Sequence, residues 1–122
     1  AMSYYKRRQI FPIMHIVAIR REVIERFPWV AGNLLTAFEA AKRNAVARAE
    51  EITASRLPFA WAQLAAERMA KRFGGDPWPY GVEPNRTTLD TFCAWAHEQG
   101  VAHRRLQPED LFPAELLQRY RI

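Results

Sequence analysis

The pattern of apolar positions begins with one segment that favours a strand. Residues 10–19 read Ile-Phe-Pro-Ile-Met-His-Ile-Val-Ala-Ile, which is dense in β-branched and apolar side chains. Because Pro12 lacks a backbone N–H, we expect the strand to start at about Ile13 and to end near Ile19. A lone buried strand would leave its backbone groups unpaired, which is costly. Its partner would then belong to another chain or to a larger protein, unless the run is instead a core helix.

The remaining apolar positions follow the 3.6-residue period of helices. Gly74 and Gly75 are typical of a helix end, as is Gly100. Thr87 and Asp90 approximate a capping box at a helix start, with Asp in place of the usual Glu or Gln. The pattern predicts a mostly α chain with one or two β-strands, and it predicts helices over about 28–54, 58–73, 87–99 and 108–121.

The third of these helices carries the clearest buried stripe. Leu89, Phe92, Cys93 and Ala96 recur at the spacing of one helix face. Cys93 is therefore expected to be a small core residue, and no neighbouring base indicates a nucleophile.

Length and charge narrow the class of protein. The 122 residues correspond to one domain, and no window has the ~20 apolar residues of a membrane span. The net charge of +5 comes from 18 basic and 13 acidic residues that are interleaved, so neither a nucleic-acid partner nor a membrane partner is expected. A signal peptide is not expected either, and a single cysteine fits a cytoplasmic location.

The run Trp78-Pro-Tyr-Gly-Val-Glu-Pro-Asn-Arg86 is the most specific motif of the chain. With residues 10–23 and 28–42, and with a tail that includes His97-Glu-Gln-Gly100 and residues 104–115, it resembles the C-terminal third of the 4,5-dihydroxyphthalate decarboxylase family. The resemblance implies the C-terminal part of a two-lobed α/β type 2 periplasmic-binding-protein-like fold, with a ligand between the lobes. It would make residues 13–19 a strand of the first lobe's sheet, and most of the cleft would lie outside these 122 residues.

The reaction implied by the resemblance needs an acid that protonates the ring carbon as CO₂ leaves, and a cation that orients carboxylates. His15 is the candidate acid, because its unperturbed pKa lies near neutrality; a buried histidine bonded to backbone is the alternative. Arg86 is the candidate cation, although it could equally pair with Glu83. Tyr80, Glu83 and Asn85 complete the candidate substrate-binding set, while turn and cap roles suit Tyr80 and Asn85 as well.

Three functions therefore remain open. The first is the C-terminal segment of a carboxy-lyase acting on a dihydroxylated aromatic acid, inactive alone and completed by the N-terminal portion of a parent protein. The second is a non-catalytic solute-binding module for a small anion. The third is a standalone helical interaction domain, in which a second chain pairs the strand in a homo-oligomer. No metal site is predicted, since His97 and His103 have no zinc-ligand spacing, and no cofactor is indicated.

Overall fold

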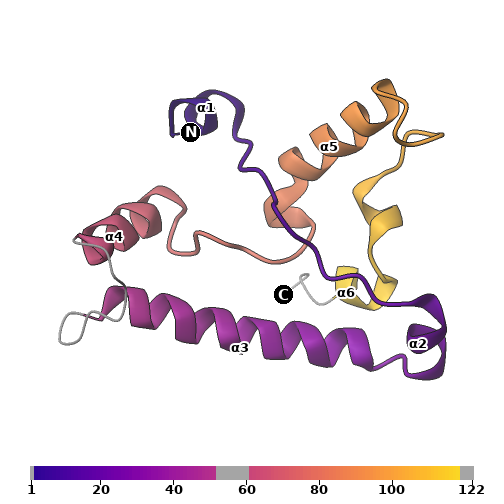
Figure 1. Cartoon of the computed structure of the whole chain (residues 1–122), viewed down its shortest axis with the longest axis horizontal. Coiled ribbons are helices and arrows are strands. Elements are labelled where there is room, and N and C mark those ends of the chain that lie inside the picture. Colours follow the sequence, from indigo (N-terminus) through magenta and orange to yellow (C-terminus); the bar gives the residue numbers. More distant parts are fainter. Residues whose placement is uncertain (1, 52–60, 119–122) are drawn as a thin grey trace. The chain divides into compact units, whose positions relative to one another are not determined.

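The computed structural model describes residues 2–51 and 61–118, and every regular element in these two ranges is a helix (Figure 1). The elements, with η marking 3₁₀-helices, are α1 (Met2–Arg8), α2 (Arg21–Arg26), α3 (Val30–Glu50), α4 (Ala62–Arg72), η1 (Glu83–Asn85), α5 (Arg86–Glu98), η2 (Pro108–Leu111) and α6 (Ala114–Gln118). None of these helices is both long and apolar enough to cross a membrane.

The chain divides into two compact units, which are described separately. The first unit consists of Ala1–Gly32 and Tyr80–Ile122, and the second unit is Asn33–Pro79. The long helix α3 starts in the first unit and continues through the second. The expected end of the first long helix near residue 54, the start of the next near 58 and the end of the last near 121 lie outside the described residues.

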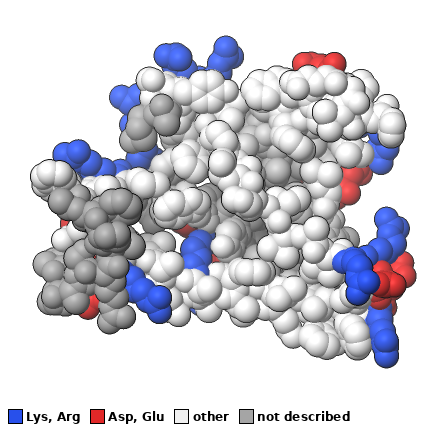
Figure 2. Space-filling view, viewed as in Figure 1, with Lys and Arg blue, Asp and Glu red and all other residues white. Residues whose placement is uncertain are grey.

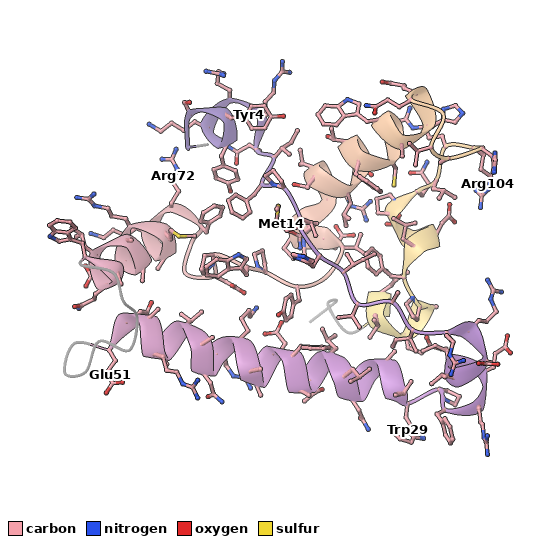
Figure 3. All side chains as sticks on the ribbon, viewed as in Figure 1. Tyr4, Met14, Trp29, Glu51, Arg72 and Arg104 are labelled. Atoms are coloured by element: carbon pink, nitrogen blue, oxygen red, sulfur yellow. The ribbon has the colours of Figure 1, made fainter. Side chains whose placement is uncertain are left out.

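The predicted strand over residues 13–19 is wrong, and with it the α/β fold class. Residues 9–20 run without regular secondary structure between α1 and α2, and no strand occurs anywhere in the described ranges. Residues 11–18 are all exposed, and Met14, which is labelled in Figure 3, is 80% exposed. A strand requires a neighbour that completes its hydrogen-bond ladder, and β-branched composition cannot supply one. The described part of this chain is a small helical domain.

A small apolar core holds the first unit together. Leu89 and Cys93 of α5 are 6% and 4% exposed, and α5 contacts both η1 and η2. Val82, just before η1, and Pro108, at the start of η2, are also buried. The predicted stripe of α5 is therefore partly confirmed: Leu89 and Cys93 are buried, whereas Phe92 is 59% exposed.

The ends of α5 follow one prediction and depart from another. Gly100 has a φ of 72° and donates its N–H to the carbonyl of His97 at 3.1 Å, as expected for a helix-ending glycine. The predicted capping box is wrong, because the helix starts at Arg86 and places Thr87 inside its first turn. Asn85 occupies the N-cap position and makes no side-chain cap bond.

The described residues of the second unit, 33–51 and 61–79, bury little apolar surface. Among its described residues Pro77 alone is buried, while Phe38, Leu64 and Trp78 are 40%, 42% and 50% exposed. Helix α4 ends at Arg72 and is closed by Gly75, which has a φ of 105° and donates its N–H to the carbonyl of Ala70 at 2.8 Å. Within the described residues of this unit, polar contacts join α3 to the loop after α4.

Candidate functional site

The loop that leads into α5 is shaped by a glycine and a proline. Gly81 has a φ of 102°, a conformation that side chains with a Cβ rarely adopt. Pro84 lies in the single turn of η1, where a missing N–H costs little. The Nδ2 group of Asn85 donates to the carbonyl of Gly81 at 2.9 Å and closes the loop, and the buried Val82 anchors it. The sequence thus fixes the start of α5, and with it the position of Arg86.

Arg86 lies between two carboxylates. Its Nη2 and Nε groups donate to the two oxygens of Glu83 at 2.5 Å and 3.3 Å. The same Nη2 group also donates to Glu109, which comes from η2 and is 23 residues further along the chain. The three side chains keep 37%, 67% and 43% of their surface exposed, in the order Arg86, Glu83, Glu109. The arrangement is an open ion cluster with one positive and two negative charges.

The hydrogen bonds of the cluster favour the charged forms of Arg86 and Glu109. The hydrogen bonds to Glu83 and Glu109 raise the pKa of Arg86, so this guanidinium is always charged. The hydrogen bond from Arg86 holds the pKa of Glu109 below its usual range, so this carboxylate stays ionised at neutral pH. Because all three groups are solvent-accessible, their attraction is screened and its contribution to stability is modest.

Of the predicted substrate-binding residues, the structure therefore brings Glu83, Asn85 and Arg86 into one short stretch. Arg86 pairs with Glu83, which is the alternative that the sequence left open. Tyr80 is half-buried and begins the same loop within the first unit. Their role toward a substrate stays a prediction. A ligand carboxylate that binds Arg86 has to approach two protein carboxylates that already contact this guanidinium.

His15 lies in the exposed segment between α1 and α2 and is itself exposed. It forms no hydrogen bond or ion pair within the described part of the chain. The segment is attached to α5 four residues earlier, where the backbone N–H of Phe11 donates to the Thr88 hydroxyl at 3.4 Å and that hydroxyl donates to the carbonyl of Phe11 at 3.4 Å. The structure thus joins the segment that carries His15 to the first turns of α5, and it does not bury the histidine.

A second polar cluster, in the second unit, was not predicted from the sequence. Lys42 on α3 has a side chain only 10% exposed, and its Nζ group contacts Glu39 at 3.1 Å and Asp76 at 2.8 Å. The same Nζ group donates to the carbonyl of Trp78 at 3.0 Å, and the Trp78 N–H donates to Asp76 Oδ1 at 2.9 Å. Burial alone would lower the pKa of Lys42, but the hydrogen bonds to Asp76 and Glu39 outweigh it and raise that pKa.

The sequence contained one partial signal for this cluster. An aspartate two residues before a hydrogen-bonded N–H is a common turn device, and Asp76-Pro77-Trp78 has that form. The partnership with Lys42 spans 34 residues, however, and no local pattern indicates it. The cluster's satisfied hydrogen bonds give it a structural role, since a lysine held in its charged form is a poor nucleophile or base.

The structure supplies no metal centre in residues 2–51 and 61–118, where no three potential ligands from histidine, cysteine, aspartate and glutamate come together. His97 and His103 are both exposed. Burial raises the pKa of the Cys93 thiol, and the nearby carboxylates Asp90 and Asp110 add to that effect. Cys93 is therefore a buried, neutral thiol.

In sequence, this chain is similar to a known decarboxylase. No protein-family model matches the sequence. All of the chain aligns with a 4,5-dihydroxyphthalate decarboxylase from Comamonas testosteroni, with 40% identity over 125 positions. The chain spans only 37% of the length of that relative. The alignment thus covers the whole of this chain but only part of the enzyme.

Proposed function

We propose that this chain is a segment, C-terminal in position, of a decarboxylase that acts on a dihydroxylated aromatic acid. The supporting observation is the alignment, because 40% identity extends over the whole chain rather than over one motif. Since the matched portion is 37% of the relative, the proposed activity is one that these residues contribute to within a longer polypeptide, and the chain alone is expected to be inactive.

The proposed reaction breaks the bond between a ring carbon and a carboxylate. The bonding electrons stay on the ring as CO₂ leaves, and an acid then delivers a proton to that carbon. In the proposed assignment His15 supplies the proton. Its exposure in the isolated chain suits a group that meets its substrate only when further polypeptide surrounds it. Arg86 holds a carboxylate of the substrate, and Tyr80 and Asn85 bind the ring hydroxyls.

The test is a chimera. The segment of the Comamonas testosteroni protein that aligns with this chain is replaced by these 122 residues, and CO₂ release from 4,5-dihydroxyphthalate is followed. We expect turnover by the chimera and none by the 122 residues alone. In the chimera, His15→Gln should lower kcat by about 100-fold, the lower end of what general acid catalysis contributes.

Matched substitutions separate a catalytic role from a loss of folding. His103→Gln replaces another exposed histidine and should leave kcat unchanged. Arg86→Lys should raise KM more than it lowers kcat, whereas Arg105→Gln should change neither. A folded chimera that binds a small anion but releases no CO₂ would contradict the decarboxylase assignment and favour a solute-binding module.

A further inference from the structure

The ion cluster around Arg86 holds its two carboxylates differently. Glu83 lies three residues before Arg86 and contacts both Nε and Nη2, a two-pronged contact that the start of α5 builds in. Glu109 contacts Nη2 alone, and it reaches Arg86 from a different element, η2. Of the two, Glu109 is therefore the carboxylate that another anion can replace at a lower cost.

The position of η2 does not depend on the contact between Glu109 and Arg86 alone. Asp110 accepts the backbone N–H of Gln107 at 3.0 Å in a capping box that closes this turn. Pro108 is fully buried, and η2 packs against α5. The Glu109 side chain can leave Arg86 by rotating toward solvent, because 43% of its surface is already exposed.

The charge balance sets the condition for ligand binding. With Glu83 and Glu109 both on the guanidinium, the cluster carries one net negative charge, and Asp110 beside it adds another that Arg104 offsets across 3.5 Å. An additional carboxylate would enter against that charge, whereas a carboxylate that takes the place of Glu109 keeps the number of anions on Arg86 at two.

We propose that Glu109 is an internal competitor for Arg86, and that a ligand binds this site through a carboxylate that replaces it. The proposal rests on the function proposed above, and it adds a specificity residue to it. The site then selects aromatic acids over neutral phenols of the same shape, because only a carboxylate reproduces the hydrogen bond that Glu109 gives up.

The experiment measures anion binding by the 122-residue chain, with benzoate and phthalate as the probes. The ¹⁵N resonance of the Arg86 Nε group reports occupancy of the guanidinium directly. Glu109→Gln should tighten binding of both probes about two- to fivefold at low salt, the range that an exposed ion pair contributes. Catechol, which has hydroxyls and no carboxylate, should leave the Arg86 resonance unmoved in both proteins.

Glu98→Gln is the matched control, since it removes one exposed negative charge from α5, the helix that carries Arg86, without removing a contact to Arg86. Tightening by Glu109→Gln alone supports the proposal, as does loss of that gain when Arg86→Gln is added. Equal effects of Glu109→Gln and Glu98→Gln would overturn it, and so would an Arg86 resonance that benzoate shifts in neither protein. A chimera without turnover whose Glu109→Gln form still binds benzoate more tightly would contradict the proposed enzyme and leave the competitor role standing.

Discussion

The two units of this chain are stabilised by different forces. The first unit closes around a few buried apolar residues, among them Leu89 and Cys93 on α5, Ala31 on α3 and Pro108 at η2. The second unit has one buried residue among those described, Pro77, and the cluster of Lys42 with Asp76, Glu39 and the Trp78 carbonyl joins its helix α3 to the loop after α4. Among the described residues, buried apolar side chains hold the first unit together, whereas hydrogen bonds to a nearly buried charge connect the second.

That difference shows what an amphipathic pattern can and cannot specify. Helix α5 buries Leu89 and Cys93 of its stripe because η1 and η2, close to it along the chain, provide the covering surface. Helix α4 carries apolar positions too, yet Leu64 stays 42% exposed and Trp61, just before the helix, stays 79% exposed. Periodicity identifies the face that is able to be buried, and the presence of a partner decides whether it is.

The largest expected effect is on the core of the first unit. Leu89→Ala removes a buried side chain and leaves a cavity, so it should lower the free energy of unfolding by about 2–4 kcal/mol. Leu64→Ala, on the half-exposed face of α4, should cost less than about 1 kcal/mol. Urea unfolding followed by far-UV circular dichroism measures both. Equal losses would mean that the first unit has no distinct core.

The second effect concerns the cation that ties the second unit together. Lys42→Met keeps the length of the side chain but removes the ammonium group that contacts Asp76 and Glu39, at a cost of about 1–3 kcal/mol. Hydrogen exchange at the Trp78 amide, which is bonded to Asp76, should accelerate accordingly. Arg43→Met, one position along on an exposed part of α3, serves as the control. If both variants exchange at the same rate, the cluster does not hold this loop.

A smaller effect is expected at the glycine that ends α5. Gly100 has a φ of 72°, and a Cβ placed there meets no other atom within 4 Å, so only backbone strain opposes a side chain. Gly100→Ala should therefore destabilise the first unit by about 1 kcal/mol. Gly100→Asn should recover part of that loss, because asparagine tolerates the left-handed region. Thermal unfolding of the three proteins would show the order, and an alanine variant as stable as the parent would contradict it.

The smallest expected effects are changes of stability with pH, and they should differ in direction between the two units. The pKa of Glu109 is lowered in the folded state, so its contribution is present above its unfolded pKa and is lost as the pH falls through the folded value. The pKa of Lys42 is raised, so its contribution is present below its unfolded pKa and is lost as the pH rises through the folded value.

Acid should therefore loosen the contact of η2 with Arg86, and alkali the loop around Asp76. Amide exchange in each unit against pH tests the two directions. Glu109→Gln should remove the acid response at η2, and Lys42→Met the alkaline response at the loop. A response of both units at the same end of the pH range would contradict the assignment.

Local signals in the sequence predicted the local features of this structure. The helix expected over about 87–99, the burial of Leu89 and Cys93 on it and its end near Gly100 all depend on residues a few positions apart. The same holds for the pairing of Arg86 with Glu83, which the sequence left open as one of two alternatives. The misplaced start of α5 is also a local matter: η1 leads straight into the helix, so Asn85 rather than Thr87 takes the cap position.

The features that escaped prediction join residues far apart in the sequence. Glu109 reaches Arg86 across 23 residues, and Asp76 reaches Lys42 across 34. The strand expected near His15 failed for the same reason, because composition describes one strand and says nothing of the neighbour it would need. Around Arg86, the sequence therefore indicated the possible contact with Glu83 but not the second carboxylate, Glu109.

The buried cysteine has a practical consequence. Cys93 is the one thiol in the sequence, it is 4% exposed, and its raised pKa keeps it protonated. A thiol reagent added to the folded protein can modify it only when α5 separates from the elements that cover it. The rate of that single modification therefore measures how often the first unit opens spontaneously, and no label has to be introduced.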